Sequence, residues 1–146
     1  MRIEKEVQRR RALWTSLKSR FDPPDSVPPT VLNELRIFRG QAGIWVDVIE
    51  TRDRESTTGI TVGLLHKGGR YPDELRSDGL TYHYPVTDRP GTDAMEIAAT
   101  KTACRLEVPV FVITPGVAAR TRNVHFSRVS RWDDERHAFE VEFLRE

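Results

Sequence analysis

The spacing of apolar residues changes near residue 32, and this change divides the chain into an arm, a connector and a core. In residues 1–21, MRIEKEVQRRRALWTSLKSRF, apolar side chains recur at intervals of three, four and seven, the pattern of one helix face. They are Ile3, Val7, Trp14, Leu17 and Phe21. The consecutive arginines Arg9, Arg10 and Arg11 interrupt this face, and we expect them to point mostly outward.

Four prolines in DPPDSVPP follow the predicted helix. Because proline cannot continue a helix and restricts the backbone, residues 22–31 are predicted to form a stiff connector. Residues 1–21 are then a basic amphipathic helical arm, and residues 32–146 form a single core domain.

From residue 32 onward the pattern is that of strands, with short segments rich in β-branched residues and bounded by Gly, Asp or Arg. The predicted strands are residues 35–38, 43–51, 59–66, 80–86, 108–114, 123–132 and 137–146. The last two join across DDER as a hairpin. One long helix is predicted over 92–107, with Thr92 as its N-cap. The sequence therefore predicts an α+β fold: a strongly curved, mostly antiparallel sheet or partial barrel, with one core helix and the N-terminal helical arm.

The charge is distributed unevenly along the 146 residues, although the net charge is only +1. The first 20 residues carry seven Lys or Arg against two Glu, so the remaining 126 residues are mildly acidic. Two interpretations of the arm stay open: a helix docked on the body with a solvated basic face, or a helix that also lies near phosphates.

The composition also limits the setting in which we expect the protein to work. No apolar run approaches the roughly 20 residues that a membrane helix needs, and the basic N-terminus lacks the apolar core of a signal peptide. We therefore expect a soluble, cytoplasmic protein. Cys104 is the single cysteine and the four histidines have no ligand spacing, so we predict no disulfide and no metal site.

Signatures of catalysis are missing from the sequence. It contains no GxxxxGK[ST], GxGxxG, HExxH or nucleophile-elbow motif, and no acid-x-Lys pair of the kind that metal-dependent nucleases use. Asp73 and Glu74 are adjacent carboxylates, but the sequence fixes no cation beside them. We expect a protein that is not an enzyme and needs no cofactor, with a metal-dependent nuclease as an alternative.

The segment HKGGRYPDELRSDGLTYHYP, residues 66–85, gathers glycines, tyrosines and carboxylates. On a strand Tyr82 and Tyr84 place both rings on one face, and Tyr71 lies across the preceding loop. A planar base between two aromatic faces gains about 1 to 3 kcal/mol per stacked ring. Asp73 or Glu74 can accept a hydrogen bond at the edge of such a base. The alternative is that the tyrosines only pack the sheet.

Glycines in the same segment leave room for a ligand. Gly68 and Gly69 precede the first tyrosine, and without side chains they let the backbone approach a bound group closely. The segment is therefore predicted to form a pocket for a flat ligand.

Four segments of the chain resemble, in their order and spacing, the SRA (SET- and RING-associated, or YDG) domain over about residues 36–146. They are QAGIWVD, residues 66–85, PVFVIT and VHFSRVSRWDDERHAFEVEF. The resemblance implies a PUA-like curved sheet that binds double-stranded DNA containing 5-methylcytosine and flips the modified base into a pocket. Bacterial versions of this fold also occur fused to HNH nucleases as their recognition halves. This sequence has no HNH half, so the resemblance implies a nucleoid-associated reader and not a nuclease.

The resemblance also implies roles for individual residues. Tyr71 and Tyr84 match the two tyrosines that sandwich the base, with Tyr84 ahead of Tyr82. Two arguments disagree about which carboxylate reads the base. In an extended segment Asp73 points to the same side as Tyr71, whereas counting residues from the family's tyrosine favours Glu74. We prefer Asp73. The loop that approaches DNA at the gap left by the base matches Gln41, Ala42, Gly43 and Ile44.

Candidates for phosphate contacts are Arg39, Lys67, Arg70, Arg89, Arg120 and Arg122. The chain departs from the family at Arg70, which replaces a glycine of the turn, and in the shortened segment VTDRPGTD that replaces a long finger. An RNA-binding PUA-like module that stacks an unpaired base in the same place is a further alternative. The sequence does not distinguish a preference for methyl from one for hydroxymethyl.

Overall fold

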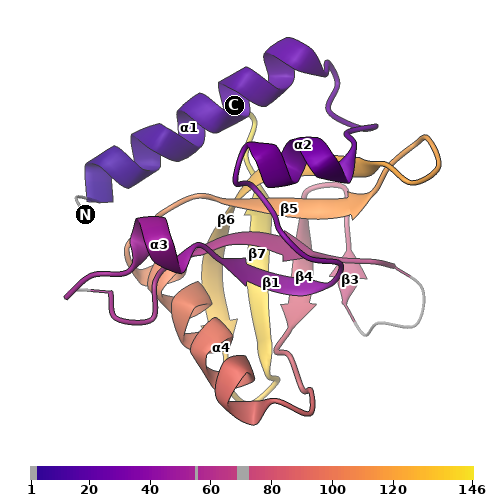
Figure 1. The fold of residues 1–146 in the computed structure, drawn as a ribbon. Helices are drawn as coiled ribbons and strands as arrows, with labels where there is room; N and C mark the ends of the chain where they lie inside the picture. The colour runs from indigo at the N-terminus through magenta and orange to yellow at the C-terminus, as the bar shows by residue number, and fades with distance from the viewer. Residues whose placement is uncertain (1–2, 55, 69–72) are drawn as a thin grey trace.

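The computed structural model describes residues 3–54, 56–68 and 73–146, which form one strongly curled mixed sheet with helices packed on it (Figure 1). The order of its seven strands is β1-β2-β5-β6-β7-β4-β3. Strands β2 and β5 are parallel and the other neighbours are antiparallel. The strands are β1 (Gly43–Val46), β2 (Thr61–Leu65), β3 (Glu74–Leu75), β4 (Gly79–His83), β5 (Val110–Pro115), β6 (Arg122–Asp133) and β7 (Ala138–Phe143). The helices are α1 (Ile3–Arg20), α2 (Pro29–Glu34), α3 (Val48–Thr51) and α4 (Pro90–Arg105).

The long strand β6 produces the curl of the sheet. Its first half, from Arg122 to Ser127, pairs with β5, and its second half, from Ser127 to Asp133, pairs with β7. A register shift between Val129 and Arg131 lies in the second half. Because such an irregularity bends a strand and increases its twist, β6 turns the corner between the two parts of the sheet. The result is a half-barrel, as the sequence predicted.

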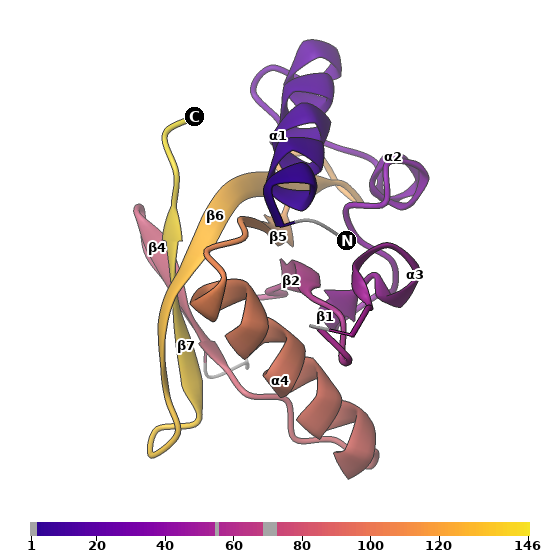
Figure 2. The same ribbon diagram turned by 90° about the vertical axis from the view of Figure 1, so that its left-hand side faces the viewer.

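The two faces of the sheet carry two hydrophobic clusters. Along β5 every second side chain points the same way, so Phe111 and Ile113 join the cluster beneath α1 and α2, while Val110 and Val112 join the cluster beneath α4. A strand covered on both faces is apolar throughout, which explains the sequence VFVIT. Figure 2 shows α1 across one side of the sheet and α4 inside its curl.

The predicted arm is docked on the sheet through its apolar face. Trp14 stacks on Phe126 with ring centroids 5.6 Å apart, and Leu17 is fully buried in the same cluster. The indole nitrogen of Trp14 also donates a hydrogen bond to the backbone oxygen of Glu146. The helix and the C-terminal segment therefore hold each other against β5 and β6.

The expectation that Arg10 points outward is wrong, because its side chain is completely buried. Its guanidinium donates hydrogen bonds to the backbone oxygens of Thr61 (2.6 Å) and Pro109 (2.8 Å) and to the carboxylate of Glu6 (2.7 Å). The residue lies three positions after Val7 and four before Trp14, so the helix turns it toward the sheet. Burial lowers the pKa of Arg10 to about 10, and the charge of Glu6 opposes this shift.

Most predicted elements of the core are confirmed with small changes of boundary, and two predictions are wrong. Residues 35–38 are not a strand: Pro28 and Pro29 start helix α2, and the chain then turns at Arg36, whose φ is 56°. The predicted strand 43–51 ends at Val46, because the side chain of Asp47 accepts a hydrogen bond from the Glu50 backbone and caps α3.

Two boundaries elsewhere also differ from the prediction. Helix α4 starts at Pro90 with Arg89 as its N-cap instead of Thr92, and the short strand β3 was expected to be loop. None of the helices in the described part of the chain has the length and apolar character that crossing a membrane requires.

Candidate functional site

A cavity of about 370 Å³ lies where the two ends of the curled sheet face each other. One wall comes from the start of β1 and the end of β2, and the opposite wall from β4 and the segment after it. Its lining residues are Ala42, Gly43, Leu65, Lys67, Asp73, Tyr82, His83, Tyr84, Pro85, Val86 and Thr87. Since four strands lie between β1 and β4 in the sheet order, only the curl brings these segments together.

The two tyrosines that the sequence placed on one face both line this cavity and are both buried, with exposed fractions of 5% for Tyr82 and 9% for Tyr84. The ring of Tyr84 packs against Phe139 with centroids 4.7 Å apart, and its hydroxyl donates a hydrogen bond to Asp134 (2.8 Å). Burial and this hydrogen bond raise the pKa of Tyr84 well above its usual value. The aromatic wall is therefore rigid and uncharged.

Of the two adjacent carboxylates, Asp73 lies in the cavity wall. One of its oxygens, Oδ1, accepts a hydrogen bond from the backbone N–H of His83 (2.8 Å), and Oδ2 lies 3.4 Å from Nδ1 of His66. Nδ1 of His83 is also 3.4 Å from Oδ1 but makes no hydrogen bond within the described residues. Only 8% of the Asp73 side chain is exposed.

Glu74, by contrast, points away from this cavity. It is exposed and lies in β3, where its backbone pairs with Thr81. Its side chain lines a separate small cavity of about 130 Å³ that includes Arg131, Arg136 and Glu140. Asp73 thus lies in the same cavity as Tyr82 and Tyr84 and Glu74 does not, whereas Tyr71, to which the alternation argument referred, lies outside the described residues.

The loop before β1 contributes only part of the predicted DNA-approaching segment to the surface. Gln41 and Ala42 are exposed, and Gly43 adopts a left-handed φ of 77° at the cavity wall. Ile44 is 6% exposed and pairs with Leu64 between β1 and β2, so its side chain packs in the core beneath α4. Of the four residues of β1, Ile44 is the one whose side chain is buried.

Of the predicted glycines, Gly68 has a φ of 78° and open space where a side chain would begin. Gly69, Arg70 and Tyr71 lie outside the described residues. The predicted aromatic partner of Tyr84 on the other side of a ligand therefore stays a prediction.

The predicted cations fall into two groups. Lys67 and Arg122 line a second cavity of about 420 Å³, which shares Leu65 and Lys67 with the tyrosine cavity. Arg39 lines a third of about 290 Å³ beside it, and its guanidinium lies 5.8 Å from the Trp45 ring. Within residues 3–54, 56–68 and 73–146, none of these three cations has a carboxylate at ion-pair distance. They form a positively charged surface next to the tyrosine cavity.

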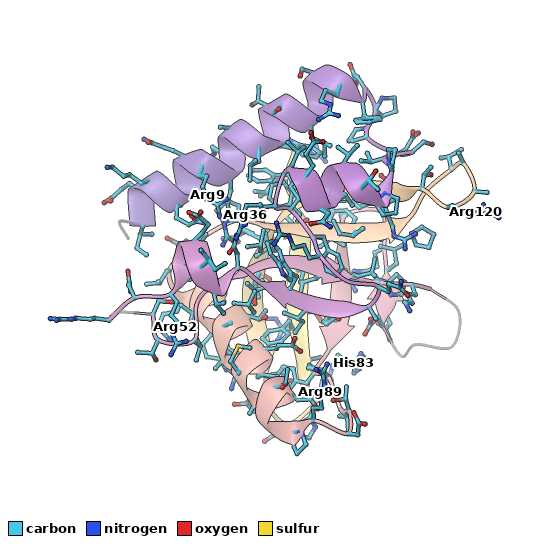
Figure 3. The ribbon with its side chains drawn as sticks, viewed as in Figure 1. Arg9, Arg36, Arg52, His83, Arg89 and Arg120 are labelled. Atoms are coloured by element: carbon cyan, nitrogen blue, oxygen red, sulfur yellow. The ribbon has the colours of Figure 1, made fainter. Side chains whose placement is uncertain are left out.

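The other two described cations lie elsewhere. Figure 3 shows Arg120 at the tip of the loop between β5 and β6, and Arg89 beside the start of α4. Arg120 is exposed with a left-handed φ of 63°. These two residues lie on different parts of the molecule, so a single short ligand does not reach both.

Sequence reasoning missed three residues that shape the site. His66 contacts Asp73, and Lys101 and Asp134 form an ion pair (2.9 Å) behind Tyr84. These residues come from the position after β2, from α4 and from the β6–β7 turn, which are distant in sequence. No group of three or more His, Cys, Asp or Glu side chains in the described part of the chain is arranged to hold a metal ion.

The fold is similar to that of the SRA domain of SUVH5, which has been crystallised with several DNAs. The complex with hemimethylated CG DNA shares 20% identity with a TM-score of 0.56, over 82% of this chain and 84% of that chain. The complex with methylated CHH DNA shares 20% with a TM-score of 0.57, over 85% and 88%. The complex with fully hydroxymethylated CG DNA shares 21% with a TM-score of 0.54, over 85% and 92%.

This likeness shows that the chain has an SRA-like fold. No protein-family model matches the chain, and no curated protein matches it by sequence.

Proposed function

We propose that this protein is a non-catalytic reader of modified cytosine in double-stranded DNA, and that it binds the modified base in the cavity formed by Tyr82, Tyr84 and Asp73 after the base has left the helix. The observation that carries the proposal is the position of Asp73, a buried carboxylate in the wall of a cavity lined by aromatic rings. The known SRA structures, determined with methylated and hydroxymethylated DNA, support the choice of ligand.

The chemistry of the cavity suits a cytosine. Cytosine carries an amino donor at N4, and an ionised carboxylate accepts from it. The rings of Tyr82 and Tyr84 offer apolar contact to the flat faces and the 5-substituent. The volume of about 370 Å³ lies within the usual range for small-ligand sites.

The energies are compatible with base flipping. Extruding a base costs a few kcal/mol. Stacking returns about 1 to 3 kcal/mol per aromatic ring. A charge-assisted hydrogen bond to Asp73 and phosphate contacts add to this gain. Lys67, Arg122 and Arg39 lie beside the cavity without carboxylate partners in the described residues, so they suit the backbone on either side of a flipped nucleotide.

One binding titration tests the proposal. The protein is titrated with duplexes that differ only in one cytosine, which is unmodified, 5-methylated or 5-hydroxymethylated, at fixed salt concentration. We expect at least several-fold tighter binding to a modified duplex than to the unmodified one. Equal affinity for all three duplexes contradicts the proposal, and a preference for matched single-stranded RNA would favour an RNA-binding module instead. Magnesium-dependent cleavage of the DNA would indicate a nuclease.

The adjacent carboxylates give a matched pair of variants for the same titration. Asp73→Ala should weaken binding to the methylated duplex by about 1 to 3 kcal/mol, because the amino group of the enclosed base loses its acceptor. Glu74→Ala should change little, since Glu74 lies outside the cavity. Wild-type binding by a folded Asp73→Ala protein would refute the assignment of Asp73, and a large loss in Glu74→Ala alone would move the role to Glu74.

A further inference from the structure

We propose that His66 is a positioning residue that makes Asp73 selective for a base with an exocyclic amino group. This inference rests on the proposed function, because it concerns the same cavity and the same ligand. It adds a residue to which neither the sequence patterns nor the fold gave a role.

The position of His66 is fixed by the sheet. His66 directly follows β2, and its backbone N–H donates a hydrogen bond to the Ile113 oxygen of β5 (2.8 Å). This bond continues the pairing of the parallel strands β2 and β5 by one residue. Only 6% of the His66 side chain is exposed, so the ring is held in one place by its surroundings.

The ring lies against one oxygen of Asp73 while the backbone holds the other. Nδ1 of His66 is 3.4 Å from Oδ2, and the N–H of His83 is 2.8 Å from Oδ1. Each carboxylate oxygen accepts about two hydrogen bonds, so both oxygens keep acceptor capacity for a ligand. His66 also lines the neighbouring 420 Å³ cavity, which places it between the two cavities.

The proposed selectivity follows from the difference between 5-methylcytosine and thymine. 5-Methylcytosine and thymine carry the same methyl group, but cytosine has an amino donor where thymine has the carbonyl acceptor O4. An ionised carboxylate accepts from the first and repels the second. A carboxylate turned away from the base neither accepts from the amino group nor repels O4, so the distinction is lost.

A donor at Nδ1 of His66 prevents this loss. An N–H directed at Oδ2 opposes rotation of the carboxylate, whose other oxygen is held by the backbone N–H of His83. Removing that donor should therefore weaken the discrimination between the two bases more than it weakens binding to DNA in general. A histidine that only filled space in the core would not have this effect.

The test compares two amide variants in the full chain. The side-chain nitrogen of asparagine occupies nearly the position of Nδ1, whereas that of glutamine reaches the position of Nε2. The readout is the ratio of the dissociation constants for a duplex with a thymine–guanine mismatch and for one with 5-methylcytosine at the same site. His66→Gln should lower this ratio about tenfold, the effect of losing roughly one hydrogen bond's selectivity. His66→Asn should keep most of it.

His125→Asn is a matched control, because His125 is a partly buried histidine on β6 that stacks on Phe143 and does not line the tyrosine cavity. Its ratio should equal that of the wild type. A ratio unchanged in His66→Gln, or lowered equally in the Asn and Gln variants, overturns the proposed role of His66. If His66→Gln fails to fold, as judged by thermal unfolding, His66→Ala takes its place, because alanine also lacks a donor at the position of Nδ1, and it must lower the ratio.

The wild-type protein separates this failure from that of the proposed function. If the wild type binds methylated, unmodified and mismatched duplexes equally, the proposed function is wrong and the inference on His66 falls with it. If the wild type discriminates among them and both His66 variants match it, only the inference on His66 is wrong.

Discussion

The hydroxyl of Tyr84 lies 2.8 Å from the carboxylate of Asp134, which joins the segment after β4 to the turn between β6 and β7. Nζ of Lys101 on α4 lies 2.9 Å from the same carboxylate oxygen. The amino group is also 5.8 Å from the Tyr84 ring centroid. Helix α4, the β6–β7 turn and the segment after β4 thus meet behind the Tyr84 ring, and they fix the orientation of one wall of the cavity.

Tyr84→Ala should remove most of the preference for methylated DNA, because a stacked ring contributes about 1 to 3 kcal/mol to binding a base. Tyr84→Phe is the matched control: it keeps the ring, so the preference should persist, while loss of the hydrogen bond to Asp134 lowers the unfolding free energy by about 1 kcal/mol. Titration with methylated and unmodified duplexes checks both variants. A folded Tyr84→Ala protein with wild-type preference would show that Tyr84 does not stack on the base.

The cations beside the cavity should govern the salt dependence of binding. In a protein with both Lys67→Gln and Arg122→Gln, the slope of log affinity against log salt concentration should fall by about 0.9 per lost phosphate contact, for every DNA sequence alike. The preference for methylated DNA should survive. Arg52→Gln is the control, since Arg52 is exposed at the end of α3 and lines none of the four cavities described above. A double variant with the wild-type slope would exclude these residues as phosphate contacts.

Arg10 should be essential for stability although it lies in a basic segment. Arg10→Met removes the hydrogen bonds that Arg10 donates to three backbone oxygens and removes a buried partner of Glu6, so the unfolding free energy should fall by about 3 to 5 kcal/mol. The neighbouring Arg11 is more than half exposed and pairs with Glu146 at the surface, so Arg11→Met should cost less than about 1 kcal/mol. Urea unfolding followed by circular dichroism compares them. Similar stability of the two variants would contradict the role of Arg10 in docking α1.

Two glycines should respond oppositely to alanine. A side chain at Gly79 would collide with the backbone oxygen of Val141 on β7, so Gly79→Ala should lower the unfolding free energy by about 1 to 3 kcal/mol. Gly91 lies in the first turn of α4 with open space around it, so Gly91→Ala should raise that free energy by about 0.4 to 1 kcal/mol. Thermal unfolding measures both. A neutral Gly79→Ala would mean that β4 and β7 can separate locally at little cost.

Local patterns predicted most of the elements, because they depend on residues close together in the chain. The apolar run of β5, the alternation in β6 and β7 and the turn between them identify strands without any tertiary information. The same local rules place Tyr82 and Tyr84 on one face. The local rules fail at residues 35–38. Pro28 and Pro29 start helix α2 before this segment, and this matters more than the β-branched and apolar residues that the segment contains.

The arm shows where a local reading of charge fails. Three successive arginines look like a solvated basic face, and an isolated helix would expose all of them. The carbonyl oxygens of Thr61 and Pro109 face the buried Arg10 and accept hydrogen bonds from its guanidinium. Such partners lie 51 and 99 residues away, so no pattern in the arm itself reveals them.

The sequence by itself determined most of the strands, the long helix and the shared face of Tyr82 and Tyr84, because each of these follows from the two-residue or 3.6-residue period of a single element. Only the tertiary structure decided that Asp73 contacts His66, that Asp134 holds Tyr84, and that Ile44 belongs to the core. These relationships arise when the curl of the sheet brings its two ends together. That closure depends on the pairing of β6 with two different neighbours, which is a property of the whole sheet and of no single segment.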